Sequence, residues 1–147
     1  MKHKRNLETG ELMHKSVQKL SFLYSDLYSD MKKGEEMDRY FEVKGTDLRI
    51  LLPEEVDHFN AERIRKEADR ILQSRNIRRI VFDFSRTQFM DSSGIGVIMG
   101  RYKNMRFMGG TVIAVHVNER IRRILTLSGV YKVLDIYEGQ PLQSNIF

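Results

Sequence analysis

From about residue 40 onwards, apolar residues recur with two different spacings, which predict alternating strands and helices. Residues 40–43 and 48–52 are strand-like runs on either side of Gly45, so they predict a β-hairpin. Further short apolar runs predict strands at residues 79–84, 111–115 and 133–137.

The segments between these strands have apolar residues at helical spacing. Helices are predicted at residues 60–74 and 92–107 and from Asn118 to the Gly129 stop, with Asn60 and Asn118 as N-caps. The residues predicted to face the core are Ile64, Ala68, Ile71 and Leu72 in the first helix, Ile95, Ile98, Met99, Tyr102 and Met105 in the second, and Ile121, Ile124 and Leu125 in the third.

This alternation predicts an α/β fold with a single mixed sheet, mostly parallel, and about three main helices. The length of 147 residues fits one domain, at residues 37–147, after an N-terminal extension at residues 1–36. Because such folds place their sites beyond the carboxyl ends of the strands, Asp57 and the Asp91–Ser92 pair are candidate site residues.

Two interpretations of the extension stand open. Leu20, Leu23, Tyr24 and Leu27 have helical spacing, which fits a true N-terminal arm. Residues 34–37 (Gly-Glu-Glu-Met) are what a purine-rich ribosome-binding site encodes when it is read in frame, so the natural start is alternatively Met37. On this second interpretation, residues 1–36 are dispensable.

Composition excludes several classes of protein. Hydrophobic residues make up 41% of the chain, enough for a core, yet no apolar run is long enough to span a bilayer or to act as a signal peptide. The absence of cysteine rules out disulfides and thiolate zinc sites, and the four histidines are scattered without metal-ligand spacing. We therefore expect a cytoplasmic protein without a membrane span or a bound metal.

The net charge of +5 raises the question of nucleic-acid binding. The arginines alternate with acidic residues, as at 63–67 and 119–123, and no nucleic-acid motif or base-stacking pattern accompanies them. Solvated helix faces or an acidic protein partner explain the charge better, so no direct contact with nucleic acid is expected.

The sequence Asp91-Ser92-Ser93-Gly94 lies where a strand leads into a helix N-terminus. Asp91 is first of all a predicted helix cap. A cap does not account for Gly94, Gly96 and Gly100, since a glycine inside a helix costs about 1 kcal/mol relative to alanine. Gly96 and Gly100 are predicted to lie opposite the core face, with Val97, Arg101 and Lys103 around them, which favours a docking surface.

Enzymatic chemistry has little support. A serine hydroxyl needs a base to act as a nucleophile, and no nucleophile-elbow, phosphate-binding-loop or kinase motif is present. We expect a protein that is not an enzyme but can receive a phosphate, because amides at a helix N-terminus stabilise its charge.

Residues 89–103, Phe-Met-Asp-Ser-Ser-Gly-Ile-Gly-Val-Ile-Met-Gly-Arg-Tyr-Lys, resemble the phosphorylation segment of anti-sigma factor antagonists, whose fold is the STAS domain. The resemblance extends over residues 40–137 and is closest to the sporulation branch, which acts on the forespore sigma factor system. It implies a STAS-like sheet, phosphorylation on Ser92, and a position near Ser92 for Val56-Asp57-His58. Glu54 and Asn60 depart from the family's Gly and Thr. The predicted partner-binding residues are Asp57, Asp91, Ser93, Gly94, Ile95, Gly96, Val97, Gly100 and Arg101.

The resemblance also implies a mechanism. The unphosphorylated chain binds an anti-sigma factor that is a serine kinase, and so frees the sigma factor. Phosphorylation on Ser92 by that partner reverses binding, and a serine phosphatase resets the switch. Nucleotide belongs to the kinase, so no cofactor is expected on this chain. The alternative is a STAS module that binds a nucleotide or anionic ligand at the serine loop, which is the segment Asp91-Ser92-Ser93-Gly94. Asp83 is interpreted as a strand-end or solvent-facing residue.

Overall fold

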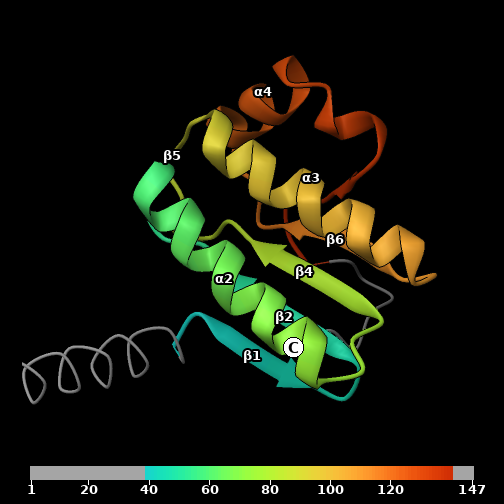
Figure 1. Ribbon diagram of the computed structural model, residues 1–147. Helices are drawn as coiled ribbons and strands as arrows, with labels where there is room; N and C mark the ends of the chain where they lie inside the picture. Colours follow the sequence, from blue (N-terminus) through green and yellow to red (C-terminus); the bar gives the residue numbers. More distant parts are fainter. Residues whose placement is uncertain (1–38, 141–147) are drawn as a thin grey trace, which may run out of the picture. The chain divides into compact units, whose positions relative to one another are not determined.

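The computed structural model of this protein describes residues 39–140. This part of the chain forms a five-stranded sheet with strand order β1-β2-β4-β6-β7, and helices α2 and α3 lie side by side on one face of it (Figure 1). The elements are β1 (Phe41–Lys44), β2 (Asp47–Leu51), β3 (Glu55–Val56), α2 (His58–Ser74), β4 (Arg79–Asp83), β5 (Phe89–Met90), α3 (Ser92–Phe107), β6 (Thr111–Val115), α4 (Glu119–Leu127), the short 3-10 helix η1 (Val130–Lys132) and β7 (Asp135–Ile136).

The sheet is mixed and mostly parallel, which confirms the predicted fold class. β1 and β2 form the expected antiparallel hairpin, and Gly45 takes a φ of +61° in its turn. The pairs β2–β4, β4–β6 and β6–β7 are all parallel. Strand β7 is shorter than the predicted run of residues 133–137, because η1 and the turn after it occupy the chain up to Leu134.

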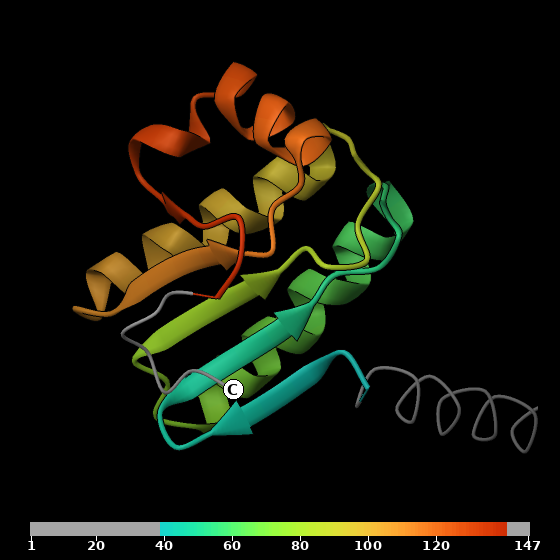
Figure 2. The ribbon, with the colours of Figure 1, turned by 180° about the vertical axis from the view of Figure 1, so that it is seen from behind.

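The main core lies between the sheet and the two long helices. Viewed from behind, the sheet is in front of α2 and α3 (Figure 2). Strand residues alternate between the two faces, and the residues of β2, β4 and β6 in the main core are Leu48, Ile50, Ile80, Phe82, Val112 and Ala114. A second, smaller buried cluster consists of the alternate strand residues Val81, Ile113 and Val115.

A short parallel pair, β3 with β5, was absent from the predicted strands. Val56 pairs with Met90 and Glu55 with Phe89, beyond the carboxyl ends of β2 and β4. Two-residue strands carry no detectable periodicity, so apolar spacing cannot reveal them. The pair matters because each of its strands leads directly into a long helix.

The predicted extension, residues 1–36, lies outside the described residues. Between residues 39 and 140, every helix is too short or too polar to cross a bilayer.

Candidate functional site

Asp91 joins β5 to α3 and is the N-cap of that helix. Its backbone is extended, with φ −95° and ψ −174°, and its carboxylate accepts a hydrogen bond from the Ser93 amide at 2.8 Å. The Asp91 amide in turn donates to the Val56 carbonyl at 3.2 Å. The predicted capping role of Asp91 is confirmed, and it fixes where α3 begins.

Asp57 has the same role at the start of α2. Its carboxylate accepts from the Asn60 amide at 2.9 Å. The predicted cap, Asn60, was wrong: Asn60 lies inside the helix, and its side-chain amide donates to the Glu55 carbonyl at 2.8 Å. Because Val56 pairs with Met90, the N-termini of α2 and α3 lie next to each other. The expected proximity of residues 56–58 to the serine loop is confirmed.

The two serines differ in their surroundings. Ser92 is the first residue of α3 and is exposed. Ser93 is half-buried, and its hydroxyl lies 3.4 Å from Nδ1 of His58 at the start of α2. The first amides of a helix point outward without intrahelical partners, and the helix dipole favours negative charge there. The exposed hydroxyl therefore lies where an added negative charge is stabilised.

The glycines of α3 fall into two groups. Gly94 is buried, and a Cβ added there would lie 2.9 Å from Cγ1 of Val56 and closer still to the Met90 side chain. Gly94 is therefore needed for packing within the chain, which explains its presence without a partner. At Gly96 and Gly100 an added Cβ would meet no described atom within 4 Å. These two positions are open, as predicted, and their role as a docking surface stays a prediction.

Val97 and Arg101 are not on the open surface, which corrects the predicted faces of α3. Both are only 6% exposed, whereas Ile95, Met99 and Tyr102, predicted to face inward, are half-buried. The Arg101 guanidinium packs toward α2, where its Nε lies 3.2 Å from Asp69 Oδ1. Burial lowers the pKa of Arg101, and the Asp69 carboxylate opposes that shift. Val97 and Arg101 therefore lie in the packing of α3 against its neighbours, and contact with a partner at these two residues stays a prediction.

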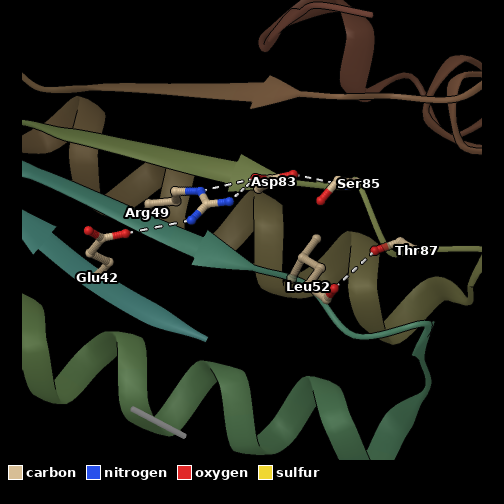
Figure 3. Close-up of polar contacts among 6 residues, drawn as sticks. All are labelled: Glu42, Arg49, Leu52, Asp83, Ser85 and Thr87. Carbon is tan, nitrogen blue, oxygen red and sulfur yellow. Dashed lines mark hydrogen bonds and ion pairs between the residues drawn. The ribbon is translucent and has the colours of Figure 1, made fainter. Parts of the chain in front are cut away.

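Asp83, interpreted from the sequence as a strand-end or solvent-facing residue, ends β4 but is fully buried. Its carboxylate accepts from Arg49 Nε at 3.0 Å and from the Ser85 amide at 2.9 Å, and Arg49 also approaches Glu42 (Figure 3). Burial raises the pKa of Asp83, but the hydrogen bonds from Ser85 and Arg49 outweigh burial and hold it below the ordinary value. The sequence offered no signal for this network, since the partner residues lie on different strands.

Three chemical features meet at the start of α3. Within residues 39–140, no three His, Cys, Asp or Glu side chains gather closely enough to hold a metal ion. The loop offers an exposed hydroxyl, the amides of a helix N-terminus and an adjacent open helix surface. This arrangement suits covalent modification by another protein.

The STAS domain family model matches residues 40–140. The chain belongs to the STAS domain family. It is 39% identical over 93 residues to the anti-sigma F factor antagonist of Paenibacillus polymyxa, an overlap of 63% of this chain and 80% of that protein. It is 28% identical over 91 residues to the anti-sigma-B factor antagonist of Bacillus subtilis, covering 61% and 81% of the two chains.

Solved structures of the anti-sigma factor antagonist SpoIIAA resemble this STAS protein at 27% sequence identity. The unphosphorylated form matches with a TM-score of 0.60, covering 65% of this chain and 84% of that one. The phosphorylated form matches with a TM-score of 0.54, covering 65% and 89%.

Proposed function

We propose that this STAS protein is an anti-sigma factor antagonist that works by partner switching. The unphosphorylated chain binds an anti-sigma factor serine kinase and thereby releases the sigma factor. The kinase then transfers phosphate to Ser92, the complex dissociates, and a serine phosphatase restores the binding form. Nucleotide is held by the kinase, so this chain needs no cofactor.

The observation that carries the proposal is the place of Ser92 on α3. Ser92, Gly96 and Gly100 follow one another at intervals of four residues, so they lie along one side of the helix. Ser92 and Gly96 are exposed, and both glycines leave open space. We call the side of α3 at Gly96 and Gly100 the open stripe. A phosphate on Ser92 therefore lies at its N-terminal end. The relative SpoIIAA, which has been solved in unphosphorylated and phosphorylated forms, supports a switch of this kind.

A phosphate here acts on the interface more than on the fold. It adds about −1.5 to −2 charges at pH 7, which the amides and dipole of α3 stabilise in the free protein. Once a partner covers the stripe, the same group adds bulk and a desolvated charge beside the Asp91 carboxylate. Since each 1.4 kcal/mol changes affinity tenfold, a modest repulsion is enough to dissociate the complex.

Mass spectrometry after incubation with the cognate anti-sigma factor kinase and ATP tests the phosphorylation step. We expect one phosphate, on Ser92. Ser92→Ala should take up no phosphate and still bind the ADP-loaded kinase, whereas Ser92→Asp should bind weakly. Phosphate mainly on Ser93, or none on the wild-type chain, would refute the proposal.

Calorimetric titration tests the contact surface. Gly96→Leu should weaken kinase binding by about 1–3 kcal/mol, the range of interface hot spots, because it fills the open stripe. Gln73→Leu places the same side chain on an exposed position in the last turn of α2 and is the matched control, which should bind like the wild type. Equal affinities of all three proteins would place the partner on another surface.

The alternative function, binding of a nucleotide or anionic ligand at the serine loop, is separated from this one by equilibrium dialysis. Stoichiometric uptake of ATP or GTP by the chain alone, lost in Ser92→Ala, would favour the alternative. We expect no uptake without the kinase.

A further inference from the structure

Thr87 is the one uncharged polar residue among the buried polar residues of the described chain, residues 39–140. The other two, Asp83 and Arg101, are ion-paired, whereas Thr87 is a neutral hydroxyl with 0% exposure. A buried hydroxyl is unfavourable unless it finds hydrogen-bond partners. Its position between β4 and β5, a few residues before Asp91, makes those partners relevant to the serine loop.

The partners of Thr87 come from both neighbouring loops. Its hydroxyl donates to the Pro53 carbonyl at 3.0 Å. Figure 3 shows its longer contact, to the Leu52 carbonyl at 3.4 Å. Its own carbonyl accepts from the side-chain amide of Asn118, the N-cap of α4, at 2.8 Å. The loops that follow β2, β4 and β6 are therefore joined at a single residue.

From Thr87 a continuous series of hydrogen bonds leads to the serine loop. The Gln88 amide donates to the Glu54 carbonyl at 2.8 Å, and the Asp91 amide donates to Val56 at 3.2 Å. Between them, β5 pairs with β3. Asp91 then caps α3 immediately before Ser92. Both flanks of the segment from residue 88 to residue 91 are thus fixed, one by Thr87 and the other by the helix.

We propose that Thr87 is a positioning residue for phosphorylation of Ser92, an inference that rests on the proposed function. In the transfer, Oγ of Ser92 bonds to the γ-phosphorus of ATP, the bond from that phosphorus to the β–γ bridging oxygen breaks, ADP leaves, and the hydroxyl proton passes to the kinase. Phosphoryl transfer depends on in-line placement of the acceptor oxygen. Thr87 holds the loop that carries this oxygen in the orientation that transfer needs.

The test compares Thr87→Val, which keeps the shape and removes the hydroxyl, with Thr87→Ser, which keeps the hydroxyl. In steady-state phosphorylation by the cognate kinase, Thr87→Val should lower kcat about tenfold and leave KM within twofold, since kinase contacts lie on α3 rather than at Thr87. Thr87→Ser should restore kcat to within twofold of the wild type. A wild-type kcat in Thr87→Val, or a change confined to KM, would overturn the proposal.

A control variant separates positioning from a general loss of stability. Ile77→Val loosens the core just before β4, at the end of the sheet opposite the serine loop. We expect it to melt earlier and to keep its kcat. The two variants are compared where their melting temperatures are equal. If Ile77→Val then loses as much kcat as Thr87→Val, the role of Thr87 is only structural and the proposal fails.

A readout without the kinase separates this proposal from the proposed function. Amide hydrogen exchange at Gln88 and Asp91 should be at least tenfold faster in Thr87→Val, with exchange in β2 and β4 unchanged. Unchanged protection at Gln88 and Asp91 would refute the anchoring role. Absence of phosphate on the wild-type chain alongside the faster exchange would refute the proposed function instead and leave Thr87 as the anchor of the loop.

Discussion

Replacing Gly96 and Gly100 by alanine tests whether the open stripe of α3 lowers the stability of the protein. An added methyl group meets no described atom within 4 Å at either position, and neither glycine is among those with positive φ. Alanine is favoured over glycine inside a helix by about 1 kcal/mol. Each substitution should therefore raise the free energy of unfolding by about 1 kcal/mol, and the pair by about 2 kcal/mol, because the gain comes from the backbone of each residue and neither methyl group meets a described atom.

Thermal unfolding monitored by circular dichroism measures this change in stability directly. For a domain of this size, 1 kcal/mol corresponds to a shift of about 4 °C, so we expect Tm to rise by about 4 °C for each alanine and by about 8 °C for both. The same variants should bind the anti-sigma factor kinase more weakly. Opposite effects on stability and binding are the signature of residues retained for an interface.

Gly94→Ala is the matched control in the same helix. Its methyl group would lie 2.9 Å from Cγ1 of Val56, so this variant should lower Tm. If Gly96→Ala and Gly100→Ala also melt earlier than the wild type, the two positions are not open and the argument from α3 is wrong. If they melt later but bind the kinase with unchanged affinity, the stripe is open and the partner lies elsewhere.

Two further predictions concern the ion pairs. Because its hydrogen bonds hold the pKa of Asp83 below the ordinary value of 3.8, its carboxylate stabilises the fold above that pH, and the contribution is lost as pH falls through the lowered value. The excess stability of the wild type over Asp83→Asn, measured by urea unfolding, should thus be constant from pH 7 to 5 and shrink below pH 3.8. Arg101→Glu should lower the free energy of unfolding by about 3 kcal/mol, since it buries a carboxylate against Asp69. The exposed change Lys103→Glu should stay within about 0.5 kcal/mol of the wild type, and equal effects of both would contradict the burial of Arg101.

Helices and strands long enough to show a repeating apolar spacing were predictable from the sequence, and the two-residue strands were not. The boundaries of α3 and β6 match the predicted ranges, because several apolar side chains in each share one period. The N-cap of α2 was predicted three residues late, at Asn60 instead of Asp57. Asp57 and Asn60 are both good caps, and the choice between them is made by the pairing of Val56 with Met90, which keeps the chain extended up to Asp57. That pairing joins strands distant in sequence, so no local pattern contains it.

The faces of α3 show the same limit at the candidate site. A single apolar stripe of period 3.6 assigns every arginine to solvent, and for Arg101 this was wrong. The helix packs on the sheet and also beside α2, so its buried arc is wider than one stripe and includes Val97. Arg101 is accommodated because Asp69 of α2 supplies a compensating charge. The open positions Gly96 and Gly100 were predictable, since helical spacing places both opposite the predicted core face. The buried Gly94 carries the same helical cost, so that cost alone does not separate an open glycine from a packed one.

The geometry of α3 suggests how one phosphate can change binding without a change of fold. The Asp91 carboxylate already accepts the hydrogen bond of the Ser93 amide, and Gly94 packs closely against Val56 and Met90. The start of α3 is therefore fixed before any modification. A phosphate on the exposed Ser92 gains from the helix dipole and displaces no buried contact. Its effect therefore falls on whatever covers Gly96 and Gly100. We therefore expect the proposed switch to act at the interface by charge and bulk. In thermal unfolding, the free protein should melt at nearly the same temperature with or without the phosphate.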